Sequence, residues 1–411
     1  MSEVEAQYED YPYPARDPAD ETRRLVEGSP SDAGEIRHHV FAGRPLPSPF
    51  RALIAGGGTG DAAIQLAQHM ASGGIAGEVL YLDLSRASRK IAEDRARVRG
   101  LTNIRFATGS LLDAARHGTF DYIDCCGVLH HLEDPAAGIA ALAAALAPGG
   151  GLGLMLYGRI GRRGVYDAQA VLRALSADGE PLADRIGLAR AYLANLPATN
   201  WLARNPAIGD HKTGDAGLVD LLLHGRDRAY GVEEMWDLIE GAGLGLAGFI
   251  PAARYDPAFY LDDPALRRRA ERLAPRTAHA VAEQIAGNLK VHVAYAVKPG
   301  GKGPRGPAPA TPDAVPMPHR IDMEALARAL SSGRTVPVAF DGLQRPLRLP
   351  EGAAGVVRLI DGARSIGQIA KALDGGSRAD RTRRVVAVTQ ALIACGLCLL
   401  RHDGRQALTD R

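Results

Sequence analysis

Residues 51–68 read RALIAGGGTGDAAIQLAQ, and residues 78–88 read EVLYLDLSRAS. An apolar run leads into a glycine-rich turn and then a helix-forming segment, and Asp83 ends the next apolar run. Glycines lack the Cβ that would keep a ligand away from the backbone, and the helix start offers free N–H groups. An acid at the tip of the second strand can bind a pair of ribose hydroxyls. The pattern therefore predicts a nucleotide-like ligand, and by itself it fits nicotinamide and flavin cofactors as well.

The alternation around this turn predicts the fold class. Between residues 51 and 158 short apolar runs alternate with helical patterns, which is typical of a parallel sheet covered by helices on both faces. Residues 159–230 interrupt the rhythm with a mixed helical insert. After it, residues 231–250 predict a helix followed by a strand, and NLKVHVAYAV at 288–297 predicts a last strand.

Length and charge limit the function classes. A chain of 411 residues with 46% hydrophobic content can bury a large core and predicts two or three domains. The formal net charge of +2 indicates neither a nucleic acid nor a membrane surface as partner. The acidic N-terminus lacks the apolar core of a secretory signal, and no apolar run of about 18 residues is present. We expect a cytoplasmic protein without a membrane partner.

The chain beyond the sheet predicts a linker and a second, smaller domain. Residues 299–318 are too rich in Pro and Gly for a packed core, so we expect a linker there. Helical patterns follow in residues 319–411, and Ser365 with Gln368 forms a capping-box pattern. These elements resemble a small winged-helix fold. The pair Cys395 and Cys398 lies in an apolar segment without a second pair, so we expect apolar packing there and no metal site.

Two later segments distinguish between the ligand classes. FDYIDCCGVLHHLEDP at 120–135 and ALAPGGGLGLMLYG at 145–158 follow the glycine turn at a spacing that resembles class I S-adenosylmethionine-dependent methyltransferases. The resemblance covers residues 50–158 closely and extends loosely to residue 298. It implies a doubly wound, seven-stranded, mostly parallel Rossmann-like sheet with an antiparallel final strand. It also implies S-adenosyl-L-methionine as cofactor and methyl transfer to an oxygen or nitrogen nucleophile.

The resemblance also implies cofactor-binding residues. The loop glycines would line the methionine part, Asp83 with Leu84 would lie at the ribose, Ser110 and Leu111 would flank the adenine, and Cys126 with Gly127 would pass under the methyl group. The complete set is Gly56, Gly58, Gly60, Asp83, Leu84, Ser110, Leu111, Cys126 and Gly127. Two positions depart from the family pattern. The family usually has an acid where this chain has Ile54, and often an Asp where it has Ser110.

Candidate catalytic residues come from two places. His130 and His131 follow the fourth strand, on the carboxyl edge where ligands bind, and a histidine can serve as a base for a hydroxyl nucleophile. They could equally cap or pack. Near the N-terminus, residues 8–14 read YEDYPYP, and their two prolines predict a stiff, extended arm that carries Tyr8, Tyr11 and Tyr13. This Tyr-Pro-Tyr-Pro arm either docks as a fixed tail or closes over the pocket.

The insert is expected to contact the methyl acceptor, because the segment after the fifth strand commonly covers the acceptor pocket in this fold. Its polar residues are His211, Lys212, Asp215, His224, Arg226 and Tyr230. As an alternative, residues 220–223 form only an amphipathic stripe with a solvated face. The acceptor itself is not identified by these residues, and a small molecule or a peptide is favoured.

These observations give four regions and two functional hypotheses. The regions are an N-terminal arm and cap (1–48), a methyltransferase domain (49–298) with its insert (159–230), a linker (299–318) and a winged-helix-like domain (319–411). We expect an S-adenosylmethionine-dependent methyltransferase. The alternative is a non-catalytic protein that uses the methyltransferase fold as a scaffold and recognises a partner through the C-terminal domain. For that domain a protein or peptide partner is favoured over nucleic acid, because no aromatic stacking residues accompany the arginines of RADRTRRVV.

Overall fold

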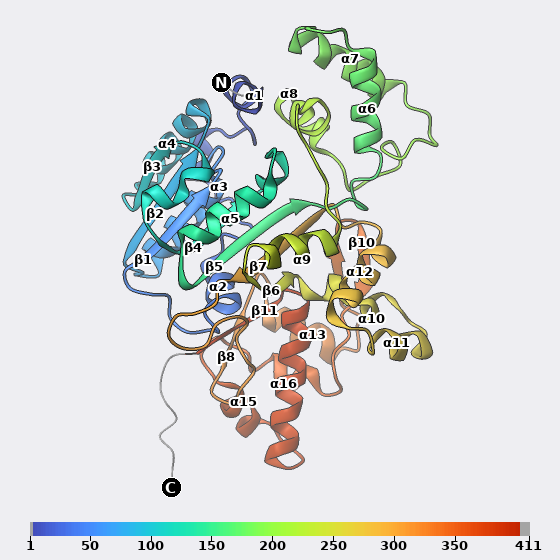
Figure 1. Ribbon diagram of the computed structural model, residues 1–411. Coiled ribbons are helices and arrows are strands. Elements are labelled where there is room, and N and C mark those ends of the chain that lie inside the picture. The colour runs from blue at the N-terminus through green and yellow to red at the C-terminus, as the bar shows by residue number, and fades with distance from the viewer. Residues whose placement is uncertain (1–2, 403–411) are drawn as a thin grey trace.

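A seven-stranded sheet organises the computed structural model, which describes residues 3–402 (Figure 1). The strand order is β3-β2-β1-β4-β5-β7-β6, and only β7 runs antiparallel to its neighbours. The strands are β1 (Phe50–Ala55), β2 (Gly77–Asp83), β3 (Ile104–Thr108), β4 (Phe120–Cys126), β5 (Leu146–Tyr157), β6 (Gly245–Ile250) and β7 (Val291–Val297). The predicted mostly parallel sheet with an antiparallel final strand is confirmed.

Helices cover both faces of the sheet, and each face carries its own apolar core. On one face α2 (Ala33–His39), α3 (Asp61–Ser72) and α4 (Arg86–Arg99) bury residues such as Ile36, Leu66 and Ala92 against the strands. On the other face α5 (Pro135–Ala145) and α9 (Val232–Gly241) pack against a second cluster. Two covered faces explain why the central strands read as continuous apolar runs.

The insert lies at the carboxyl edge of the sheet, next to the N-terminal helix (Figure 1). It consists of α6 (Val165–Leu175), α7 (Leu182–Ala194), η4 (Asp210–Lys212), α8 (Asp215–Leu218) and the π-helical turn η5 (Val219–Leu223). These elements bury an apolar cluster of their own, against which Tyr11 also packs. The remaining elements before β7 are η6 (Ala252–Tyr255), α10 (Pro257–Tyr260), α11 (Pro264–Ala270) and α12 (Pro275–Ala286).

The N-terminal segment differs from the predicted extended arm. Residues Glu3–Asp10 form helix α1, and η1 (Pro18–Thr22) follows. The carboxylate of Glu9 accepts the backbone N–H groups of Arg86 and Ala87 at the start of α4, where free N–H groups favour an anionic partner. Tyr8 O also accepts a hydrogen bond from Ser85 Oγ at 3.1 Å. The prediction of an extended arm, which began at Tyr8, is therefore wrong for residues 8–10, which belong to helix α1.

The C-terminal elements gather at the end of the molecule away from α1 and the insert (Figure 1). They are β8 (Val315–Pro318), α13 (Met323–Ser331), β9 (Pro337–Phe340), β10 (Leu343–Pro346), α14 (Ala353–Val357), α15 (Ile366–Ala372), α16 (Arg378–Ala394) and β11 (Cys398–Arg401). The Ser365 to Gln368 capping box is confirmed, and the side chain of Cys398 packs in the core of this region. Winged-helix character stays a prediction.

The expected linker is partly structured. Its last residues form β8, which pairs with β11, and Ala308 and Ala314 belong to the C-terminal apolar core. Ala308 N donates to His38 O at 2.8 Å, so the segment also contacts the N-terminal cap. The density of proline and glycine predicted an unpacked linker, yet the side chains of Ala308 and Ala314 pack in an apolar core. Within the described residues no helix has the length and apolar character needed to cross a membrane.

The buried guanidinium of Arg95 connects three segments near the glycine loop. Arg95 is 1% exposed, and its Nη1 donates to Thr59 O at 2.8 Å and to Asp61 Oδ1 at 2.7 Å. Its Nε donates to Glu21 Oε1 of η1, also at 2.8 Å. Helix α4, the loop and the N-terminal cap therefore share one buried cation.

We expect Arg95→Met to lower the free energy of unfolding by about 3 kcal/mol, because the buried Glu21 carboxylate then keeps only Arg99 as a charged partner. Chemical denaturation followed by circular dichroism measures the change. Lys90→Met is the matched control, because Lys90 lies on the same helix and pairs with Asp94 at the surface. The control should cause a much smaller change. Equal effects of the two substitutions would contradict the bridging role of Arg95.

Candidate functional site

A cavity of about 650 Å³ opens at the carboxyl ends of β1, β2, β4 and β5. The N-terminal segment covers it from one side, with Tyr8, Tyr13 and Pro14 in its wall. In parallel sheets flanked by helices, ligands bind at this edge, where the order of the strands reverses. Here β1 is that point, because the chain passes from β1 outward to β3 and then returns to β4.

The glycine loop forms one wall because its backbone adopts conformations that favour glycine. Gly56 and Gly58 have φ values of 80° and 51°. A Cβ on Gly56 would lie 2.3 Å from Val128, and one on Gly57 would lie 2.2 Å from the Tyr81 ring. The loop is therefore packed tightly against neighbouring side chains, and both Gly56 and Gly58 line the cavity. Gly57 lines the cavity as well, although the sequence analysis did not select it.

Gly60, one of the predicted cofactor residues, does not line the cavity. It is the N-cap of α3 with a φ of 104°, and a Cβ there would lie 2.8 Å from Ala92 on α4. Its small size therefore serves the packing of α3 against α4. The other eight predicted cofactor residues line the cavity: Gly56, Gly58, Asp83, Leu84, Ser110, Leu111, Cys126 and Gly127.

Asp83 holds the loop in place and faces the cavity. Its Oδ2 accepts the N–H of Gly58 at 2.8 Å, and its Oδ1 accepts the N–H of Ser85, also at 2.8 Å. Burial raises the pKa of this carboxyl, although the two backbone N–H groups act in the opposite direction. Each oxygen has a further lone pair for a ligand.

The other end of the cavity carries a buried polar cluster around Asp220. Tyr8 Oη donates to Asp220 Oδ1 at 3.0 Å, and Tyr157 Oη donates to Asp220 Oδ2 at 3.2 Å. Burial raises the pKa of Asp220 and of both tyrosines. The cluster brings together residues from α1, β5 and η5, which are far apart in the sequence. The sequence analysis did not select these three as site residues, and a lone Asp in the apolar run LVDLLL was the available signal.

His131 and His224 stack beside this cluster, with ring centroids 3.9 Å apart. His131 Nδ1 lies 2.8 Å from the carbonyl oxygen of Arg226, so this nitrogen carries a hydrogen and Nε2 has the free lone pair. His224 Nδ1 accepts the N–H of Arg226 at 3.0 Å, so in the neutral ring its Nε2 carries the hydrogen. Burial lowers the pKa of His224 to about 2, and the neighbouring His131 acts in the same direction. His131 lines the cavity.

Two predicted catalytic residues, His130 and Tyr11, do not line the cavity. His130 lies behind Tyr157, with ring centroids 3.9 Å apart, and neither ring nitrogen has a hydrogen-bond partner among the described residues. Burial lowers its pKa well below the ordinary value, so the ring is neutral. Tyr11 packs against the insert. Tyr13 does line the cavity, and burial raises its pKa.

The insert contributes only part of its predicted set to the cavity wall. Arg226 and Asp220 line the cavity, and His224 packs against Tyr8 and His131. His211, Lys212, Asp215 and Tyr230 are absent from the wall. Tyr230 instead forms a bridge with Gly158 and belongs to the core.

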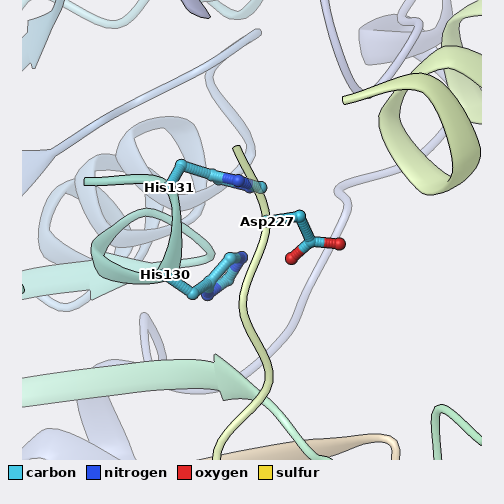
Figure 2. A group of neighbouring side chains, drawn as sticks. All are labelled: His130, His131 and Asp227. Atoms are coloured by element: carbon cyan, nitrogen blue, oxygen red, sulfur yellow. The ribbon is translucent and has the colours of Figure 1, made fainter. Parts of the chain in front are cut away.

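Two groups of side chains bring possible metal ligands within 4.8 Å of one another: His130, His131 and Asp227 (Figure 2), and His131, Asp220 and His224. In the first group Asp227 is already paired with Arg162 and accepts a hydrogen bond from Gln169. In the second group the protonated Nε2 of neutral His224 has no lone pair for a metal ion. Neither arrangement favours a metal ion.

Asp124 is the least expected acid of the site. It is fully buried on β4 and lines the cavity. Its Oδ2 accepts a hydrogen bond from Ser31 Oγ, whereas its Oδ1 has no partner at hydrogen-bonding geometry. Burial raises the pKa of Asp124 to about 7. The hydroxyl of Ser31 and the backbone of Cys126 lower this pKa, but their effect is smaller than that of burial.

This raised pKa predicts a pH effect on stability. A carboxyl whose folded pKa exceeds its unfolded value stabilises the fold below the unfolded pKa, and that contribution is lost as pH rises to about 7. Relative to Asp124→Asn, the ligand-free protein should therefore lose roughly 4 kcal/mol of unfolding free energy between pH 4 and pH 8. Urea unfolding of both proteins at each pH measures the difference. A constant difference would show that Asp124 does not titrate in this range.

Comparisons with known proteins agree with this geometry. Residues 53–152 match the family described as "Methyltransferase domain". An uncharacterized protein of Synechococcus sp. is 33% identical over 267 residues, which cover 62% of this chain and 61% of that protein. The tRNA 5-carboxymethoxyuridine methyltransferase of Escherichia coli is 33% identical over 114 residues, which cover 27% of this chain and 41% of that enzyme. The chain thus spans less than two thirds of either relative.

Solved structures resemble the fold over most of the chain. The structure of PKMT2 from Rickettsia typhi has a TM-score of 0.60 and 16% identity, covering 90% of this chain and 73% of that one. The same protein in complex with AdoHcy has a TM-score of 0.61 and 16% identity, covering 87% of this chain and 72% of that one. The likeness therefore extends beyond the matched domain.

Proposed function

We propose that this protein transfers a methyl group from S-adenosyl-L-methionine to an oxygen or nitrogen nucleophile of a small molecule or peptide, because residues 53–152 match the family described as "Methyltransferase domain". One observation carries the proposal. The glycine loop, Asp83 and the residues after β3 and β4 line a single cavity at the carboxyl edge of the matched domain. AdoHcy, the demethylated form of this cofactor, is bound by the structurally similar PKMT2.

The residues of the cavity fit this cofactor. Asp83 would bind the ribose hydroxyls through its remaining lone pairs, and Ser110 with Leu111 would flank the adenine. Gly56 and Gly58 would let the methionine part approach the backbone, since they place no side chain in the cavity. When bound, the cofactor supplies a methyl group that is already activated on a sulfonium.

The cluster around Asp220 would bind and orient the acceptor. Its carboxylate and the hydroxyls of Tyr8 and Tyr157 offer hydrogen bonds to a hydroxyl or amine in a buried setting, where such bonds are stronger than in water. His131 Nε2 would take the proton of the nucleophile, and the Arg226 carbonyl fixes the tautomer that makes this possible. Positioning is the larger share of the catalysis, because the methyl group needs no further activation.

The C-terminal region would make protein or peptide contacts. Two of its clustered arginines are engaged locally, because Arg381 donates to Ala370 O and Arg383 pairs with Asp380. This engagement supports a protein or peptide partner over a phosphate backbone. The competing function is a non-catalytic scaffold. Cofactor binding alone does not distinguish a scaffold from a methyltransferase, whereas a measurement of methyl transfer does.

Asp83→Ala should weaken the binding of S-adenosylhomocysteine about tenfold to a hundredfold, because hydrogen bonds from a carboxylate to the ribose are lost. Isothermal titration calorimetry measures the affinity, with NAD as a control ligand. Thermal melting checks that the variant is folded, since Asp83 also holds the loop. Unchanged affinity in a folded variant would remove Asp83 from the cofactor site. Tighter binding of NAD by the native protein would contradict the proposed cofactor.

His131→Gln should lower methyl transfer by about a hundredfold or more, the usual contribution of a general base, while leaving the affinity for S-adenosylhomocysteine within about twofold. Transfer of label from methyl-tritiated S-adenosylmethionine to pools of small molecules and peptides provides the assay. His211→Gln is the matched control, because His211 belongs to the insert and lies outside the cavity wall. Native rates in His131→Gln would exclude it as the base. An absence of transfer by the native protein would favour the scaffold.

A further inference from the structure

Two buried side chains in the cavity wall each carry one polar atom without a hydrogen-bond partner. Asp124 and Gln65 are 0% and 2% exposed, and both line the cavity. Asp124 Oδ1, an acceptor, and Gln65 Nε2, a donor, have no partner at hydrogen-bonding geometry. Buried polar atoms without partners are costly and uncommon. Their presence in a cavity wall indicates a ligand that supplies one donor and one acceptor.

The same short segment holds both side chains. Ser31 Oγ donates to Asp124 Oδ2, and Gly28 N donates to Gln65 Oε1 at 2.8 Å. The backbone N–H of Gly28 can only donate, so the oxygen of Gln65 points to it and the NH₂ end is the free one. The segment 28–31 therefore orients both groups and leaves one acceptor and one donor available.

The other carboxylates in the wall are already engaged. Asp61 pairs with Arg16 and Arg95, Asp83 accepts two backbone N–H groups, and Asp220 accepts two tyrosine hydroxyls. Glu27 pairs with His69, and Glu133 pairs with Arg226. Among the carboxylates of the described cavity wall, Asp124 thus has the one buried oxygen without a donor.

Asp124 lies on the strand next to β1, which leads into the glycine loop. Asp124 lies in register with Ile54 on the neighbouring strand β1, two residues before Gly56. Residues in register on neighbouring strands face the same side of the sheet. Ile54 is the position where the resembled family usually carries an acid. In this chain β4 supplies a carboxylate at the same level of the sheet.

From these contacts we propose that Asp124 and Gln65 bind the amino-acid head group of S-adenosylmethionine, with the ammonium at Asp124 Oδ1 and the carboxylate at Gln65 Nε2. The assignment rests on the proposed function. A zwitterionic head group provides the one donor and the one acceptor that the two side chains lack. A carboxylate and an ammonium brought together out of water form a charge-assisted hydrogen bond, which is stronger than a neutral one.

Calorimetry with two probes tests the assignment. S-adenosylhomocysteine carries the head group, and 5′-methylthioadenosine keeps the adenosine and thioether without it. Asp124→Asn should weaken the binding of S-adenosylhomocysteine about tenfold to a hundredfold, and Gln65→Leu about fivefold to tenfold. Neither substitution should change the affinity for 5′-methylthioadenosine by more than about twofold.

Matched controls lie on the same two elements. Asp121→Asn alters a carboxyl at the opposite end of β4, where Asp121 accepts the N–H of Arg51. Gln68→Leu alters a glutamine of α3 that is paired with Ser72 instead of the cavity. Both controls should bind S-adenosylhomocysteine as the native protein does.

The outcomes separate this inference from the proposed function. Native affinity for S-adenosylhomocysteine in both Asp124→Asn and Gln65→Leu would overturn the head-group site and leave the methyltransferase proposal standing. An equal loss of affinity for both probes would also overturn it, because the damage would then not concern the head group. If the native protein bound neither probe, the proposed function would fail, and this inference with it.

Discussion

Arg95 lies fully buried between helix α4, the glycine loop and the N-terminal cap, and the candidate site depends on this contact. A guanidinium cannot lose its charge in a protein, so its burial requires partners for its N–H groups. Glu21, Asp61 and the carbonyl of Thr59 provide them. The same interaction closes the N-terminal cap over the sheet, and this cap includes the segment 28–31 that orients Asp124 and Gln65. The contacts of Arg95 therefore help to place the segment 28–31 at the cavity.

The cavity has two ends that are built differently. The end that we assign to the cofactor is formed at the sheet edge, where the glycine loop and side chains of the strands and of α3 line the cavity. The other end is formed by side chains from α1, β5 and η5, which meet around Asp220. Residues at the ends of the strands are positioned by the sheet, whereas an inserted segment can change with the acceptor. The insert is therefore the region where specificity for the acceptor is expected to lie.

Burial explains why the acceptor end can hold so many titratable groups. The pKa of Asp220 is raised and that of His224 is lowered, so both shifts favour neutral forms. His130 is neutral for the same reason and supports the ring of Tyr157 from behind. Both tyrosine hydroxyls donate to the carboxylate of Asp220, so an incoming nucleophile would meet hydrogen-bonding groups that are already oriented.

The sequence by itself determined the sheet, the glycine loop, Asp83 and the residues after β3 and β4, because these features depend on local patterns. Apolar runs form strands, glycines permit positive φ, and chain order places the carboxyl ends of β1 to β4 along one edge. Tertiary structure alone decided what Gly60, His130 and Tyr11 do, since their neighbours come from distant segments. It also decided that Tyr8, Asp124, Gln65, Tyr157 and Asp220 line one cavity. Contacts between residues that lie tens or hundreds of positions apart arise from packing, and no local spacing encodes them.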